Sequence, residues 1–134
     1  MWKQQFEKLV KSLAQAVADT NLLVAVMVED DSNHRQAIRI WESFDKFLVP
    51  AIALFELSFF LVKNKLSLDL LDQVVKDPKI EYVENNLDDF SYLARHSDKV
   101  RHYDDVGDLI IVSVARRLGV ELKTFDKDLM KQFP

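Results

Sequence analysis

Four short apolar segments alternate with longer segments of helical periodicity along this chain of 134 residues, and the alternation restricts the folds that it can adopt. The short segments are the predicted strands, at residues 16–18, 47–49, 80–83 and 121–125. The predicted helices lie at residues 22–28, 34–44, 50–63, 66–75, 87–100, 109–118 and 127–133. Because strands that alternate with helices form parallel sheets covered on both faces, we expect an α/β fold, an α/β/α sandwich with a parallel sheet of about four strands.

The length of the chain fits one domain over residues 1–134, since domains commonly contain roughly 100–200 residues. Before the first strand, residues 2–13 carry apolar side chains at helical spacing, so residues 1–15 are expected to form a helical extension. Charged residues interrupt this segment, unlike the apolar stretch of a signal peptide. The most apolar stretch, residues 47–62, is 16 residues long, shorter than the ~20 that a transmembrane helix needs. We therefore expect a cytoplasmic protein that does not contact a membrane.

The composition excludes several kinds of site. The two glycines, Gly107 and Gly119, are 12 residues apart, which excludes a glycine-rich phosphate loop. The chain has no Cys, which excludes disulfides, thiolate zinc sites and cysteine nucleophiles and fits a reducing compartment. The net charge of −4 argues against a broad basic surface for nucleic acid. It still allows an acidic site that becomes cationic once a metal ion binds.

Four acidic residues stand at positions that a parallel sheet would bring together. Asp19 and Asp126 follow predicted strands, Asp108 precedes a predicted helix, and Glu56 lies inside an apolar helix that should be buried. The carboxyl ends of parallel strands share one edge with the starts of the following helices, so we expect the four carboxylates to converge there. A divalent cation such as Mg²⁺ or Mn²⁺, which prefers oxygen ligands, would relieve their repulsion.

Each acid also has a structural explanation. Asp19, Asp108 and Asp126 could each cap the helix that follows, a common role for Asp. Glu56 could face solvent or pair with an arginine from elsewhere in the chain. Asp128 is a rival to Asp126 for any role at the end of the last strand. The conjunction of all four positions, rather than any one of them, favours a metal site.

The stretches around these acids resemble the PIN-domain nucleases, and among them the single-domain ribonuclease toxins of the VapC kind. The resemblance is carried by ADTNLL at residues 18–23, by VP through FEL at residues 49–57, by GDLI at residues 107–110 and by LKTFDKDL at residues 122–129. These stretches occur in the family's order, with 18 residues from Asp108 to Asp126, and the match extends from about Val17 to the end of the chain.

The resemblance implies a divalent-metal-dependent ribonuclease that hydrolyses RNA phosphodiester bonds and acts as the toxin of a toxin–antitoxin pair. Its catalytic and metal-binding residues would be the acidic quartet Asp19, Glu56, Asp108 and Asp126. Polar supports would orient the quartet, namely Thr20, Asn21 and Thr124. The implied partners are a second copy of the chain and an inhibitory antitoxin. Candidate contacts to RNA phosphates are the basic residues Arg35, Arg39, Lys46, Arg116, Arg117 and Lys127.

Two features depart from the family pattern. Residues 1–15 precede the first strand, where relatives begin almost directly. Asp104 and Asp105 crowd the third acid; its spacing to Asp126 favours Asp108, and Asp105 remains an alternative. A non-catalytic module of the same fold, acting through a dimer or a peptide partner, is the competing hypothesis. An aspartyl phosphatase would want a second acid two residues after Asp19, where Asn21 stands instead.

Overall fold

A computed structural model describes residues 2–5 and 14–132 of the chain. Within these residues, four parallel strands form one sheet in the order β3-β2-β1-β4. The strands are β1 (Gln15–Ala18), β2 (Lys46–Pro50), β3 (Ile80–Val83) and β4 (Glu121–Lys123). The predicted α/β fold with a four-stranded parallel sheet is confirmed.

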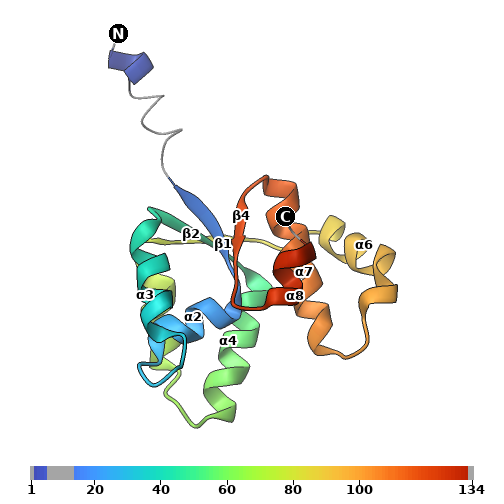
Figure 1. Ribbon diagram of the computed structural model, residues 1–134, viewed down its shortest axis with the longest axis horizontal. Coiled ribbons are helices and arrows are strands. Elements are labelled where there is room, and N and C mark those ends of the chain that lie inside the picture. Colours follow the sequence, from blue (N-terminus) through green and yellow to red (C-terminus); the bar gives the residue numbers. More distant parts are fainter. Residues whose placement is uncertain (1, 6–13, 133–134) are drawn as a thin grey trace.

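Helices connect the strands and cover the sheet on both faces (Figure 1). α2 (Thr20–Met27) and α3 (His34–Ser43) lead from β1 to β2, and α4 (Ala51–Lys63) and α5 (Asp69–Lys76) lead from β2 to β3. α6 (Leu87–Arg95), a 3₁₀ turn (Ser97–Lys99) and α7 (Asp104–Leu118) precede β4, and α8 (Lys127–Gln132) follows it. Figure 1 shows α2 and α3 on one side of the sheet and α6 and α7 on the other.

The core lies between β1, β2 and the helices that cover them. Val17, Phe47 and Val49 are fully buried because both faces of the two inner strands are covered, as in other parallel sheets. They belong to a single apolar cluster to which α4 and α7 also contribute, chiefly through Leu57, Leu61, Ile111, Val112 and Val114. The packed core fixes α4 and α7 against the sheet, and these two helices carry residues of the candidate site.

A buried polar network ties α6 and the loop before it to α7. The carboxylate of Asp89 is fully buried and accepts hydrogen bonds from Ser113 Oγ (2.8 Å), Arg117 Nε (3.0 Å) and Asn85 Nδ2 (3.1 Å). Burial raises the pKa of Asp89, but these donors together with the Asn86 N–H outweigh it and hold the pKa below its usual value. The network therefore keeps a charged carboxylate inside the protein.

The same network supplies the cap of α4. Pro50, which precedes α4, makes no side-chain cap, and the N–H of Ile52 instead donates to Asn85 Oδ1 (3.0 Å). The amide of Asn85 is held in this orientation because its Nδ2 donates to Asp89. The start of α4 is thus fixed by a residue from the loop after β3.

Several element boundaries differ from the prediction. α7 begins at Asp104 rather than after Asp108, because residues 103–107, predicted as a loop, supply two acids that favour the N-terminal turn of a helix. α6 ends at Arg95, and a separate 3₁₀ turn follows it. β4 ends at Lys123, since the N–H of Phe125 donates to a side chain, Asn21 Oδ1, rather than to a strand.

The predicted glycine cap at Gly119 and the predicted N-terminal helix have different outcomes. Gly119 ends α7 in the left-handed conformation (φ 63°), which confirms the predicted glycine cap. Residues 2–5 are helical, but residues 6–13 lie outside the described residues, so the helical extension over residues 1–15 stays a prediction. Gln15 belongs to β1 instead. Across residues 2–5 and 14–132, no helix is both long and apolar enough to cross a membrane.

Candidate metal-binding acidic cleft

The four predicted acids line one cleft at the end of the sheet where the strands terminate. The cleft has a volume of about 520 Å³, and Asp19, Glu56, Asp108 and Asp126 all contribute to its wall. Asp19 follows β1 and Asp126 lies between β4 and α8, while the other two come from α4 and α7. Strand order explains why Asp19 and Asp126 converge, since parallel strands release their following residues at one edge.

Asp19 is the most buried of the four, with 4% of its surface exposed. Its Oδ1 accepts a hydrogen bond from the N–H of Thr20 (2.8 Å), and its Oδ2 accepts one from Thr124 Oγ1 (2.7 Å). Asp19 is also the N-cap residue of α2, so the capping role applies as well. Both carboxylate oxygens are held in place, yet the group still borders the cleft.

Thr124 and Asn21 form the support behind Asp19. The Thr124 hydroxyl donates to Asp19 and accepts from Asn21 Nδ2 (3.0 Å) and from the N–H of Asp126 (3.0 Å). Asn21 Oδ1 accepts from the N–H of Phe125 (3.1 Å), which fixes the amide. These contacts place Asn21 and Thr124 where a supporting role requires them.

Glu56 is held by Thr20. The Thr20 hydroxyl donates to Glu56 Oε1 (2.9 Å), so this side chain orients Glu56, whereas only its backbone N–H contacts Asp19. The expectation that α4 is buried all round is wrong: Phe55 and Phe59 are 59% and 69% exposed. Glu56 is part-buried beside that apolar face and turns into the cleft.

Asp108 does not begin a helix, because α7 already starts four residues earlier at Asp104. Asp104 and Asp108 are therefore one helical turn apart on the same face, and both line the cleft. Asp105, the alternative third acid, is outside the cleft wall; its Oδ2 accepts from the N–H groups of Arg101 (2.9 Å) and His102 (3.1 Å).

Sequence reasoning missed three polar residues of the cleft wall, namely Asp31, Asn33 and Asp104. A helix that starts at Asp104 would have revealed that residue by its spacing to Asp108. Asp31 and Asn33 lie in the loop between α2 and α3, for which the sequence carries no comparable signal.

Asp126 both lines the cleft and caps α8. Its Oδ1 accepts hydrogen bonds from the N–H groups of Asp128 (2.9 Å) and Leu129 (3.1 Å). The capping explanation and the cleft explanation thus hold together at this residue. Asp128, its rival, is exposed and does not line the cleft.

The carboxylates of the cleft disfavour one another's ionisation. Burial raises the pKa of Asp19 despite the hydrogen bonds from Thr124 and Thr20. Burial also raises the pKa of Glu56, and nearby Asp19 adds to the effect. For Asp108, burial and the charges of Asp19, Glu56 and Asp126 raise the pKa to about 7. The cleft is therefore an anionic pocket that a cation would stabilise.

The chemistry of the donors fits a hard divalent cation. The four acids offer only oxygen atoms, and Thr20 and Thr124 hold two of the carboxylates in place. Among the described residues, no group of three or more His, Cys, Asp or Glu side chains is arranged so that it could hold a metal ion by itself. Mg²⁺ commonly keeps several water molecules and takes only one or two protein carboxylates, so the arrangement suits that ion. Asp19, Glu56, Asp108 and Asp126 are the residues that would hold it or its water molecules.

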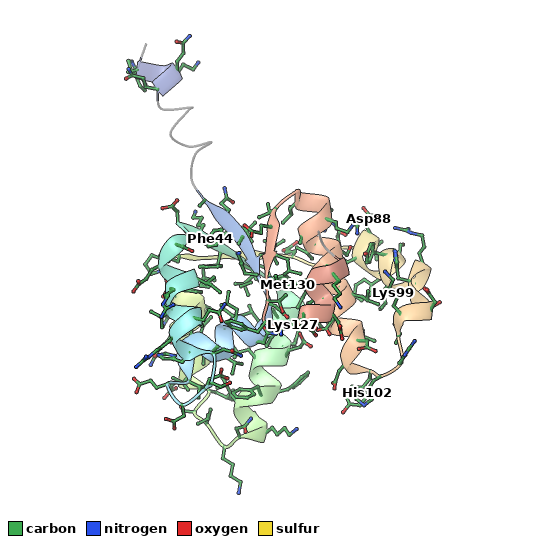
Figure 2. The ribbon with its side chains drawn as sticks, in the orientation of Figure 1. Phe44, Asp88, Lys99, His102, Lys127 and Met130 are labelled. Carbon is green, nitrogen blue, oxygen red and sulfur yellow. The ribbon has the colours of Figure 1, made fainter. Side chains whose placement is uncertain are left out.

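The basic candidates for RNA contact divide into two groups. Lys127 is exposed and directly follows Asp126, and Figure 2 shows it at the end of the sheet where β1 and β4 terminate. Arg35 and Arg39 are exposed on α3, which follows the cleft residue Asn33. These three stay predictions as RNA contacts.

The other three basic candidates lie away from the cleft. Lys46 is the first residue of β2 and is paired with Gln15, at the opposite edge of the sheet from Asp19. Arg116 and Arg117 end α7, more than two turns from Asp108. The guanidinium of Arg117 is engaged by Asp89 and by the Glu84 carbonyl (2.7 Å).

The acidic cleft gives stability a predictable pH dependence. We expect the metal-free protein to lose about 1–2 kcal/mol of stability from Asp108 as pH rises from about 4 to above 7, because the native state retains a proton that the unfolded chain has released. Solvent screening of this part-buried group keeps the loss below what the full shift implies. Urea unfolding in EDTA at several pH values measures it.

Asp108→Asn is expected to remove this pH-dependent loss, whereas Asp98→Asn, in the exposed 3₁₀ turn, should leave it unchanged. Parallel stability curves for the wild type and Asp108→Asn would contradict the electrostatic coupling.

The architecture and the cleft define a class: an α/β domain with an acidic site at the carboxyl edge of a parallel sheet. The family model of the PIN domain matches residues 16–133, and the chain belongs to this family, whose members are typically nucleases. The resemblance noted from the sequence motifs is confirmed. No curated protein matches the sequence significantly.

Solved structures of VapC toxins have the same fold. VapC20 of Mycobacterium tuberculosis, described as a sarcin-ricin-loop-cleaving toxin, has a TM-score of 0.74 and 18% identity, over 88% of this chain and 95% of that one. A toxin–antitoxin complex from Klebsiella pneumoniae has a TM-score of 0.67 and 18% identity, over 89% of this chain and 92% of that one. VapBC2 from Rickettsia felis, bound to a DNA fragment from its promoter, has a TM-score of 0.64 and 16% identity, over 90% of this chain and 93% of that one. At these identities the likeness establishes the fold alone.

Proposed function

We propose that this protein is a Mg²⁺- or Mn²⁺-dependent endoribonuclease that hydrolyses RNA phosphodiester bonds and acts as the toxin of a toxin–antitoxin pair. The observation that carries the proposal is the lining of one cleft by Asp19, Glu56, Asp108 and Asp126, four acids from four segments of the chain. Membership of the PIN family and the VapC fold support it.

The proposed roles follow from the positions of the side chains. Asp19 and Asp108 would be the main ligands, and Glu56 and Asp126 would complete the shell or hold its water molecules. A bound Mg²⁺ or Mn²⁺ ion activates water as a nucleophile and neutralises charge on the phosphate. Thr20 and Thr124 keep the carboxylates from turning away, through the hydrogen bonds described above.

The proposed partners fit two different surfaces. Phe55, Phe59 and Val62 form an exposed apolar face of α4 that ends at Lys63, and we assign this face to a second copy of the chain. The anionic cleft would attract a basic segment of an antitoxin by charge complementarity. Two of the similar solved structures contain toxins with their antitoxins, which supports such a partner.

Divalent metal is expected to raise the melting temperature of the wild type. An ion that binds the native state alone stabilises it by about 2.7 kcal/mol at a hundredfold excess over its Kd. Thermal denaturation with millimolar Mn²⁺ or Mg²⁺, compared with EDTA, measures the effect. Asp108→Asn should respond less than the wild type, and an unchanged wild-type melting temperature would contradict a site in the cleft.

The ribonuclease proposal itself is tested by incubating the protein with a mixed RNA pool, with Mn²⁺ or with a chelator, and mapping the new RNA ends. We expect cuts that need both the metal and Asp19. Metal-induced stabilisation without any cut would favour the competing hypothesis of a non-catalytic module. The observation that favours this alternative is that the described residues include no group of three side chains that could hold a metal ion by themselves.

A further inference from the structure

Gly107 occupies a position where a helix ordinarily disfavours glycine. It lies inside α7 and is buried. After proline, glycine is the least favourable residue in a helix interior. Among the described glycines only Gly119 has a positive φ, so the backbone at Gly107 does not require glycine. The reason for glycine at this position must therefore be space.

The space is filled by the carboxyl group of Glu56. A Cβ atom at residue 107 would lie 2.8 Å from Glu56 Cδ and 3.1 Å from Glu56 Oε1, and closer still to Oε2. These three atoms are its nearest neighbours, and all belong to one side chain. The carboxylate of α4 thus rests against the backbone of α7 at the place where any other residue would carry a side chain.

The other side of the same carboxylate is held by Thr20. Its hydroxyl donates to Glu56 Oε1 (2.9 Å), so Glu56 is fixed between this donor and the backbone of Gly107. Asp108, the next residue along α7, lines the cleft together with Glu56. Close approach at Gly107 therefore brings acids from two helices into one wall.

We propose that Gly107 is a positioning residue for Glu56: its missing side chain lets the Glu56 carboxylate reach the cleft beside Asp108. The link to metal binding and RNA cleavage rests on the function proposed above. A methyl group at residue 107 meets the end of a flexible side chain, which can rotate away. The fold should therefore survive the substitution while the carboxylate leaves its place.

Gly107→Ala tests the proposal, and Gly119→Ala is its matched control. We expect Gly107→Ala to keep or raise the melting temperature, since alanine favours a helix, and to lower RNA cleavage by about 10–100-fold. Its melting temperature should also rise less with Mn²⁺. Gly119→Ala, at a positive φ and with no atom within 4 Å of its added Cβ, should lower the melting temperature by about 3–5 °C and leave cleavage by the folded protein unchanged.

A second substitution separates displacement of Glu56 from a general disturbance. Glu56→Asp shortens the side chain, so the added methyl no longer meets the carboxylate. We expect Gly107→Ala to cause no further loss of cleavage in the Glu56→Asp background, a non-additivity that double-mutant cycles detect. Additive losses, or wild-type cleavage by Gly107→Ala alone, would overturn the proposal.

A crystal structure of Gly107→Ala decides the matter independently of activity. We expect the Glu56 carboxylate to have lost its hydrogen bond to Thr20, and an unmoved carboxylate would overturn the proposal. A wild type that neither cleaves RNA nor responds to Mn²⁺ would instead contradict the proposed function. In that case the crystal structure still tests the positioning of Glu56.

Discussion

Asp19→Asn and Asp108→Asn should each lower RNA cleavage by roughly 100-fold or more while the protein remains folded. Each substitution keeps the shape of the side chain but removes a negative charge from the cleft, where a metal ion must be held. Asp108→Asn should also be more stable than the wild type without metal, because burial and four neighbouring carboxylates oppose the charge of Asp108. Initial rates on a defined RNA in Mn²⁺, with thermal denaturation of the same samples, measure both effects.

Asp105→Asn is the matched control for the third acid. Its carboxylate accepts hydrogen bonds from the backbone before α7 and does not line the cleft, so cleavage should stay near the wild-type rate. Cleavage retained in both Asp19→Asn and Asp108→Asn would contradict the assigned site. Loss in Asp105→Asn with an active Asp108→Asn would exchange the roles of these two residues.

Arg117→Ala is expected to destabilise the protein by about 3–5 kcal/mol, a large part of the total stability of a small domain. The reason is Asp89, whose carboxylate is fully buried and would lose its charged partner. Urea unfolding at neutral pH measures the loss. Arg95→Ala, which removes an exposed cation from the last turn of α6, is the control and should cost about 0.5 kcal/mol or less.

Removal of the orphaned charge provides the complementary test. Asp89→Asn in the Arg117→Ala background should recover part of the lost stability, since the buried group is then neutral. A loss below about 1 kcal/mol in Arg117→Ala would contradict a structural role and return the residue to the candidates for RNA contact.

The sheet and two of the acids could be predicted from local sequence. Parallel strands leave Asp19 and Asp126 at one edge whatever their detailed packing, so strand order was sufficient for these residues. The start of α7 could not be placed in the same way. Asp104 and Asp105 suit a loop as well as the first turn of a helix, so the local pattern does not decide where α7 begins.

Hydrogen bonds between segments that are distant along the chain could not be predicted from the sequence. Asn85 caps α4 from 33 residues away, and nothing in the pattern around Ile52 indicates such a donor and acceptor pair. The hydroxyl of Thr20 donates to Glu56, 36 residues away, and the position of Thr20 beside Asp19 does not indicate which acid it contacts. Such pairings depend on how two helices approach, and neither periodicity nor capping rules determine that approach.

The distribution of the acidic cleft along the chain has a consequence for synthesis. Asp19 emerges from the ribosome early, but its neighbour Asp126 and the supporting Thr124 lie between β4 and α8, and β4 must add to β1 before the wall is complete. A chain that stops before β4 therefore lacks this part of the cleft wall, however well its first three strands have formed. Only a chain that includes β4 and the residues directly after it presents all four carboxylates together.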